Sequence, residues 1–169
     1  MSSIIKVDTI QLADGSTATA GALGLSGSTV QVVGGDINTL VTSSTTSMTD
    51  TGIEVSITPK FATSKIYIVA TFPLVMWGSA RLAGGYQLLR DSTIVAGGTN
   101  ETIHFRSFES AGPDYEVMTQ GAITKLDTPN TTSQITYKVQ MQLKNGTNIQ
   151  TLGQSNLRPC SIIAMEIAQ

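Results

Sequence analysis

The sequence predicts an all-β protein, and three observations favour that class. Serine and threonine together supply 41 of the 169 residues, whereas charged residues make up only 13%, about half the usual share. Threonine fits a half-buried pleated surface, while Asp, Glu and Lys are residues that strands disfavour. Several segments alternate apolar and polar side chains, and no long segment shows a convincing helical apolar period.

The first 28 residues are expected to form an extended arm. They begin with a strand-like apolar piece and continue into a stretch rich in Gly, Ser, Thr and Ala. Such a stretch has too few large side chains to build a core of its own. We therefore expect residues 1–28 to be an anchoring arm and residues 29–169 to be the head domain. The side chains expected to anchor the arm are Ile4, Ile5, Val7, Ile10 and Leu12.

The region that follows the arm contains two clear strands. Residues 53–57 alternate apolar and polar side chains, and Pro59 then ends the ladder because it has no N–H to donate. Residues 65–72 place Ile, Ile, Ala and Phe on one face, and the other face is only half polar. We therefore expect this strand to lie between two packed layers. The Ser- and Thr-rich residues 42–51 are expected to form a strand edge or loop held by hydroxyl hydrogen bonds.

From residue 84 onward, strand candidates recur with turn signals between them, and Asp91–Ser92 is expected to be a tight turn. The strongest candidate is 134–144, in which every second side chain is large and apolar. Asn145–Gly146 follows it and predicts a type I′ hairpin turn, with residues 147–152 as the returning strand. The other candidates are residues 86–90, 93–95, 102–108, 115–126 and 161–167.

The number and spacing of these strands predict an antiparallel β-sandwich. We prefer a jelly-roll-like architecture because eight or so strands can be counted, and such folds protect their sheet edges by closing two sheets over one core. A chain of 169 residues fits one domain plus an arm. It is also long enough to bury a core without a disulfide or a metal. Other Greek-key sandwiches remain compatible with the same pattern.

The charge and hydropathy of the chain disfavour two classes of partner. The formal net charge is −2, and no basic run is dense enough to neutralise a phosphate backbone, so we expect no nucleic-acid binding. The longest apolar stretches are too short to cross a bilayer, and the start of the chain carries no charged segment followed by a long apolar one. We therefore expect no membrane insertion and synthesis in the cytoplasm.

Residues that could carry catalysis are scarce. The single histidine, His104, is interpreted as a strand residue, and the single cysteine, Cys160, as a small buried hydrophobe. A Cys160–His104 pair is the one nucleophile–base alternative, and two ligands do not make a metal cluster. The glycine pairs fit no phosphate-binding pattern, and the loop carboxylates are interpreted as a solvated rim. The sequence thus predicts no enzyme, no catalytic residue, no metal site and no cofactor.

Two segments suit recognition better than chemistry. Trp77 is the only tryptophan, and Arg81 follows it closely. Residues 106–115 form a polar and aromatic segment that contributes Arg106, Phe108 and Tyr115. Aromatic and arginine side chains on loops of a rigid sandwich commonly contact sugars or proteins. The alternative for Trp77 is structural, namely that it plugs the end of the sandwich.

Several short phrases of the sequence carry a resemblance to a known family. They are Lys-Val-Asp-Thr-Ile-Gln at 6–11, Ala-Asp-Gly-Ser-Thr at 13–17, Ser-Ile-Thr-Pro-Lys-Phe-Ala-Thr-Ser-Lys-Ile at 56–66, Leu-Arg-Asp-Ser-Thr at 89–93 and the closing strand 161–167. Together they resemble tail-fibre-like virion appendage proteins of marine and cyanobacterial bacteriophages. The resemblance implies a virion structural protein with a β-sandwich head, commonly a homotrimer. It also implies that the protein leaves the host cytoplasm as part of the virion.

Three functional hypotheses follow from the sequence. The first is a short phage appendage whose arm anchors and whose trimeric head faces outward, in contact with the host surface. The second is a capsid decoration or cement protein that stabilises the shell. The third is a free carbohydrate-binding module that uses Trp77. The expected partners are other copies of the chain, virion proteins of the tail, neck or capsid, and a host-surface glycan.

Overall fold

The computed structural model describes residues 17, 26–37, 40–78, 82–97, 103–106, 115–152 and 160–169. This part of the chain contains eleven β-strands and no helix. The strands are β1 (Thr29–Ile37), β2 (Leu40–Ser43), β3 (Thr49–Ile57), β4 (Lys65–Gly78), β5 (Ala83–Arg90), β6 (Thr93–Ala96), β7 (Ile103–Arg106), β8 (Tyr115–Asp127), β9 (Ile135–Asn145), β10 (Asn148–Leu152) and β11 (Cys160–Ile167).

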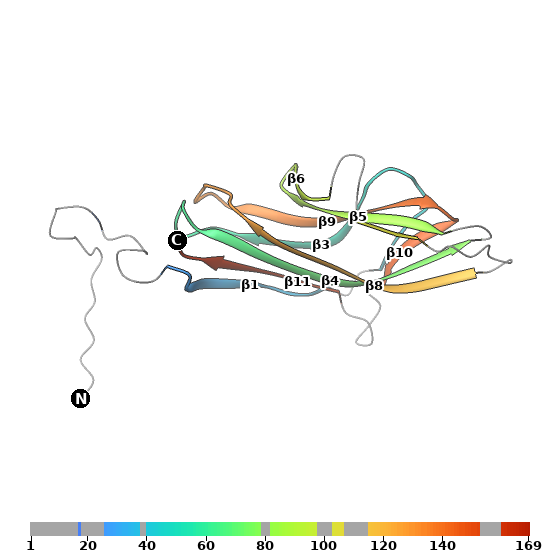
Figure 1. The fold of residues 1–169 in the computed structure, drawn as a ribbon, viewed down its shortest axis with the longest axis horizontal. Helices are drawn as coiled ribbons and strands as arrows, with labels where there is room; N and C mark the ends of the chain where they lie inside the picture. The colour runs from blue at the N-terminus through green and yellow to red at the C-terminus, as the bar shows by residue number, and fades with distance from the viewer. Residues whose placement is uncertain are drawn as a thin grey trace, which may run out of the picture.

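The strands form two antiparallel sheets that pack face to face (Figure 1). Sheet 1 has the order β1-β11-β4-β10-β2, with β8 on the other side of β4, and sheet 2 has the order β3-β9-β5-β6, with β7 also paired to β5. The strands β11 and β10 lie end to end along one edge of β4, as β6 and β7 do along β5. Each sheet is therefore four strands wide.

The pairing of these strands is nested, like one long hairpin that has been rolled up. The innermost pair is β5 with β6 and β7, followed outward by β4 with β8, β3 with β9, and β1 with β11. Successive pairs alternate between the two sheets, which is the arrangement of a jelly roll. The predicted fold class, an antiparallel jelly-roll-like β-sandwich, is confirmed.

The core lies between the sheets and follows the alternation of the strands. Ile66, Ile68, Ala70 and Phe72 of β4 are fully buried, as the sequence predicted. The Phe72 ring meets the Tyr86 ring edge-on, with centroids 5.1 Å apart, so the two sheets interlock at their centre. The predicted apolar face of 134–144 is buried as well, through Ile135, Tyr137, Val139, Met141 and Leu143.

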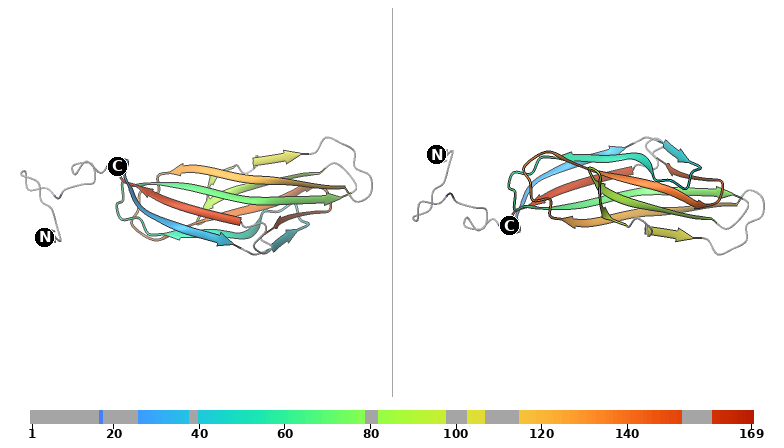
Figure 2. Two further views of the ribbon diagram at one scale, coloured as in Figure 1. Left: turned by 90° about the horizontal axis from the view of Figure 1, so that it is seen from below. Right: turned by 90° about the horizontal axis from the view of Figure 1, so that it is seen from above.

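The two ends of the sandwich differ in what the chain places there. At the proximal end, the Gly27 N–H donates to the Ala168 carbonyl (2.7 Å), and the Ala168 N–H donates to the Ser28 carbonyl (3.0 Å). The C-terminus therefore lies beside the start of β1 (Figure 1). The distal end, where β4 ends at Gly78 and β5 begins at Ala83, lies at the opposite end of the long axis (Figure 2).

The predicted Ser- and Thr-rich segment and the Asp91–Ser92 turn are confirmed. The Ser43 and Thr49 hydroxyls are 3.0 Å apart and bridge the end of β2 to the start of β3. Thr51 Oγ1 donates to the Val139 carbonyl at 2.7 Å. Asp91 has a φ of 53°, and its carboxylate accepts the Thr136 N–H at 2.9 Å. Hydroxyl and carboxylate groups thus replace backbone partners where the strands turn.

The predicted hairpin at Asn145–Gly146 is wrong. The strand before it, β9, belongs to sheet 2, whereas β10 belongs to sheet 1 and pairs with β4. Gly146 has a φ of +124°, and the next N–H, of Thr147, donates to the Trp77 carbonyl at 2.9 Å. The turn therefore carries the chain across the distal end of the sandwich instead of back along β9.

Among the described residues, the expectation that β4 lies between two packed layers is met on one face throughout, and on the other face only at Pro73 and Val75, which are buried. Its inward face packs against sheet 2, but Tyr67, Val69 and Thr71 on the other face stay partly exposed. These residues face outward from sheet 1. An apolar strand face without a covering layer is unusual, because antiparallel sheets that face water normally alternate cleanly between apolar and polar residues.

Candidate functional site

A hollow of about 300 Å³ lies at the distal end of sheet 2. Its floor is Ala83, which pairs with Asn145 of β9 on one side and with Arg106 of β7 on the other. Because Ala83 is small and its neighbours are long, the side chains on both sides stand above it. The residues that line the hollow are Ala83, Arg106, Lys144 and Asn145.

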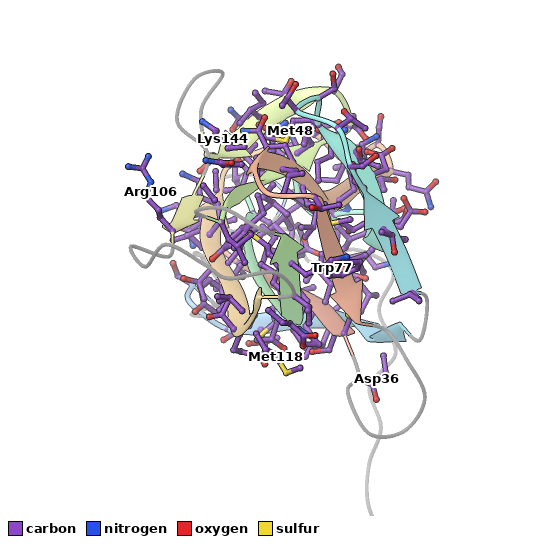
Figure 3. All side chains as sticks on the ribbon, turned by 90° about the vertical axis from the view of Figure 1, so that its right-hand side faces the viewer. Asp36, Met48, Trp77, Arg106, Met118 and Lys144 are labelled. Atoms are coloured by element: carbon purple, nitrogen blue, oxygen red, sulfur yellow. The ribbon has the colours of Figure 1, made fainter. Side chains whose placement is uncertain are left out.

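The described residues that line the hollow carry two positive charges and no negative charge. Arg106 and Lys144 are both exposed, and neither forms an ion pair with another described residue. Figure 3, which looks onto the distal end, shows both side chains at the same side of the sandwich, at the edge of sheet 2. Because Arg106, Lys144 and Asn145 can all donate hydrogen bonds, this lining suits an oxyanion such as a carboxylate, sulfate or phosphate group.

Three of the residues predicted for recognition, Trp77, Arg106 and Tyr115, belong to described strands and lie toward the distal end. Arg106 lies in the hollow, but Trp77 belongs to sheet 1 and does not line it. Trp77 is partly exposed and follows the buried Met76 near the distal end of β4, so its structural role as a plug stays a prediction. Tyr115 begins β8, where its backbone pairs with Gly78.

The remaining predicted site residues lie outside the described part of the chain. They are Arg81 and Phe108 of the recognition surface and Ile4, Ile5, Val7, Ile10 and Leu12 of the arm.

Lys144 is the residue of the hollow that the sequence analysis missed. It occupies the polar face of 134–144, where it resembles any solvated strand lysine. The sequence did place Lys144 at the end of a predicted strand. Because strand ends meet at one end of a sandwich, that position could have indicated a residue of an end surface. Its proximity to Arg106 depends on β7 and β9 both being neighbours of β5, which local patterns do not show.

The proximal end is held by a buried carboxylate. Glu166 of β11 has no exposed surface and accepts hydrogen bonds from Gln31 Nε2 (2.6 Å) and from the N–H groups of Lys60 (2.8 Å) and Phe61 (3.1 Å). Burial alone would raise the pKa of Glu166, but the donated hydrogen bonds outweigh it and hold the pKa below its usual value. Glu166 thus ties β1 and the β3–β4 connection to β11, next to the start of β1.

A second polar cluster joins the two sheets near the same end. Asp127 of β8 lies 2.7 Å from Arg90 Nη1 of β5 and accepts a 2.7 Å hydrogen bond from the Tyr137 hydroxyl of β9. Burial and the hydrogen bond to Asp127 raise the pKa of Tyr137 well above its usual value, so the phenol keeps its proton. This cluster links sheet 1 to sheet 2 through one carboxylate.

The described residues offer little for catalysis. Cys160 is fully buried, and burial raises the pKa of its thiol to about 11, so it is held as a thiol at neutral pH. No group of three or more His, Cys, Asp or Glu side chains in the described ranges could hold a metal ion. No helix in that part of the chain is long and apolar enough to span a membrane. The distal hollow suits binding and shows no nucleophile.

Comparison with known proteins gives distant structural similarity only. No protein-family model and no curated protein sequence matches the chain. The fold is similar to a chain of infectious bursal disease virus Gt strain (15% identity, TM-score 0.38) and to a mutant VP2 protein in T=1 particles derived from that virus (13%, 0.40). It is also similar to VP2 of a subviral particle (15%, 0.37). Each alignment covers 96% of this chain but 43%, 41% and 42% of those chains, so this chain spans less than half their length.

Proposed function

We propose that this chain is a non-enzymatic structural protein of a virus particle, in the form of a short phage appendage. Residues 1–28 are the anchoring arm, and residues 29–169 are an outward-facing head. The observation that carries the proposal is the separation of the two ends. The segment that leads out of the arm joins the C-terminus at the proximal end, and the hollow lined by Arg106 and Lys144 lies at the distal end.

Two further features support this function. The phrases at 6–11, 13–17, 56–66, 89–93 and 161–167 resemble those of tail-fibre-like appendage proteins, and they extend over most of the chain. The jelly roll is a fold of viral capsid and lectin domains, although a fold by itself narrows the class of function and does not fix it. The scarcity of charge also suits symmetric assembly, because like charges stacked around an axis would repel.

The proposed partners follow from the same layout. The arm binds a virion protein of the tail, neck or capsid, and three copies of the chain form a homotrimer. The distal hollow, with Arg106 and Lys144, contacts an acidic glycan of the host surface. The protein is made in the host cytoplasm and leaves it in the virion.

The test is a truncation assayed in particles. A chain that lacks residues 1–28 is expected to fold, as judged by circular dichroism, but to be absent from purified particles. A truncated chain that still enters particles would refute the anchoring role. Particles made without the protein distinguish the appendage from the cement protein. Loss of an appendage is expected to lower adsorption to cells, whereas loss of a cement protein is expected to release DNA on heating.

A further inference from the structure

The outer face of sheet 1 carries a row of apolar side chains that crosses all four strands. Val32 of β1 pairs with Met165 of β11, Met165 pairs with Tyr67 of β4, and Tyr67 pairs with Leu126 of β8. We call these four residues the apolar row. Its two ends are the most exposed, with 57% of Val32 and 49% of Leu126 accessible. Figure 2 (left) shows these four strands side by side on one face.

The surface around the row is also apolar. The next row contains Ile163 and Val69, and five of the six large apolar side chains that are exposed in the described ranges belong to sheet 1. They are Val30, Val32, Leu40, Met118 and Leu126. The charged outward residues described on the strands of this sheet, Asp36, Lys65 and Glu116, lie near strand ends. Polar side chains, among them the hydrogen-bonded pair Thr71–Ser161, interrupt this surface further along the strands. The exposed apolar side chains in and around the row still mark an interface.

The outer face of sheet 2 has the opposite character. Its outward side chains include Asp50, Glu54 and Lys138, and the Asp50–Lys138 ion pair (2.9 Å) is itself exposed. Gln87 donates to Gln140 at 2.8 Å on the same face. Along β3 and β9 this face is polar and exposed, whereas Gln87 of β5 is buried. Among the described residues, exposed large apolar side chains therefore gather on sheet 1 and not on this face.

The two edges of the apolar face complement each other. At the β1 edge lies a hollow of about 310 Å³. Its walls include the apolar Val32 and Ile163, together with Asp36 and Ser161 at one side. At the opposite edge, Leu126 and Met118 of β8 project, each with 49% of its surface exposed. A hollow on one edge and projecting side chains on the other, on the same face, fit a second copy of the chain better than an unrelated protein. Contacts between two different edges are head-to-tail, and they form a closed ring when the rotation between copies closes.

The strand directions agree with such a ring. A rotation axis parallel to the long axis keeps every copy pointing the same way, so β1 of one copy meets β8 of the next. The two strands run in opposite directions, because β1 pairs antiparallel with β11, β11 with β4, and β4 with β8. The neighbouring edges are therefore antiparallel, the better paired arrangement. All proximal ends then lie together, and all distal hollows face the other way.

The width of the sheet determines how many copies close the ring. Neighbouring strands lie about 4.8 Å apart, so a sheet four strands wide measures about 19 Å. Three such faces around an axis place the centre about 5.5 Å from each sheet, close to half the ~10 Å spacing at which sheets pack. Four faces would place it about 10 Å away and leave an open channel. A dimer would pack two such faces flat against each other. Because sheets twist, the edges of the two sheets would then lie apart, and the edges are where this surface is most exposed. A dimer would therefore leave the most exposed apolar side chains uncovered.

We propose that three copies of the chain pack around an axis parallel to the long axis, with the apolar rows turned inward and the β8 edge of each copy against the β1 hollow of the next. This inference rests on the proposed trimeric appendage and specifies its interface. The missing second layer over β4 is then the outer face of neighbouring copies.

The experiment is a measurement of molar mass by light scattering and native mass spectrometry on the full chain. The wild type is expected at three times the 17.8 kDa chain mass. Leu126→Asp removes a projecting side chain and Val32→Asp spoils the hollow, so each variant alone is expected to be a folded monomer. Both residues are about half exposed, so each variant is expected to keep the fold. Thr93→Asp, an exposed residue of sheet 2, is the matched control and is expected to stay trimeric.

Mixing the two variants tests the head-to-tail mode. Leu126→Asp keeps a hollow and Val32→Asp keeps a projecting edge, so an equimolar mixture is expected to give a species of two chains, one of each variant. A wild-type dimer or monomer, trimers in both variants, or a mixture that stays monomeric would each overturn the interface. A monomeric wild type that still enters particles through residues 1–28 would overturn this interface alone and leave the anchoring proposal standing.

Discussion

The proximal and distal ends of the sandwich are built on different principles. At the proximal end, the buried carboxylates of Glu166 and Asp127 each accept hydrogen bonds from two other elements and so join β1, β11 and both sheets. At the distal end, the charged groups Arg106 and Lys144 are exposed and make no described ion pair.

This difference indicates at which end of the sandwich substitutions can be made without loss of the fold. Removing one partner of a buried charge leaves the other uncompensated, which costs far more than removing an exposed charge. The proximal end is therefore constrained by folding, as suits the end from which an arm would be held. The distal end is free to be selected for binding. The predictions below break each end in turn.

The largest effect is expected from Asp127→Ala, because Arg90 and the Tyr137 hydroxyl then lose their shared acceptor. We expect a loss of about 3 kcal/mol in the free energy of unfolding, measured by urea denaturation. The matched control is Lys138→Ala, which breaks the exposed ion pair with Asp50 and should cost less than about 1 kcal/mol. Equal losses in the two variants would contradict the comparison between the ends.

A smaller loss is expected from Glu166→Gln. The amide keeps one acceptor oxygen, but its NH₂ group faces donors of Gln31 or of the 60–61 backbone. We expect a loss of about 2 kcal/mol at pH 7, measured by the same denaturation. If the variant unfolds at the wild-type urea concentration, Glu166 does not hold this end together.

The contribution of Glu166 should depend on pH in a known direction. Its folded-state pKa lies below its usual value, so the stability it adds is complete above about pH 4.3 and is lost as the pH falls through the folded-state pKa. The difference in unfolding free energy between the wild type and Glu166→Gln should therefore be constant from pH 7 to 5.5 and shrink below pH 4. A difference that grows on acidification would refute this assignment.

Much of the fold could be predicted from local pattern, and the reason is that one face of each strand is buried. The alternation in 53–57, 65–72 and 134–144 correctly identified the inward residues, since burial in a sandwich follows the two-residue period of the strand. The Asp91 turn was predictable because Asp tolerates a positive φ and bonds to nearby backbone.

The failures share one physical cause, which is that they depend on contacts between segments far apart in sequence. Asn-Gly after a strand favours a hairpin locally, but the next residues pair with β4 in the other sheet. The sequence analysis made no prediction for Glu166, because only the approach of Gln31 and the 60–61 backbone makes burial of its carboxylate tolerable. That Arg106 and Lys144 line one hollow could be predicted only by knowing that β7 and β9 are both neighbours of β5.

The smallest effect on stability, and the largest on binding, is expected at the distal end. Changing Arg106 and Lys144 together to Gln should alter the free energy of unfolding by less than about 0.5 kcal/mol, since both side chains are exposed. The affinity for sulfated or uronic-acid oligosaccharides should fall at least tenfold. It is measured by titrating the protein with heparin fragments and with polyglucuronate. Binding by the wild type should also weaken as salt is added, because it rests on charge.

The control for this last prediction places the same charge change at the other end. Lys60 and Lys65 lie near the proximal end, and changing both to Gln removes two positive charges without touching the hollow. If binding depends on the hollow, this control keeps the wild-type affinity, although its net charge equals that of the distal variant. If both variants lose affinity equally, the interaction follows net charge, and the distal end has no special role in recognition.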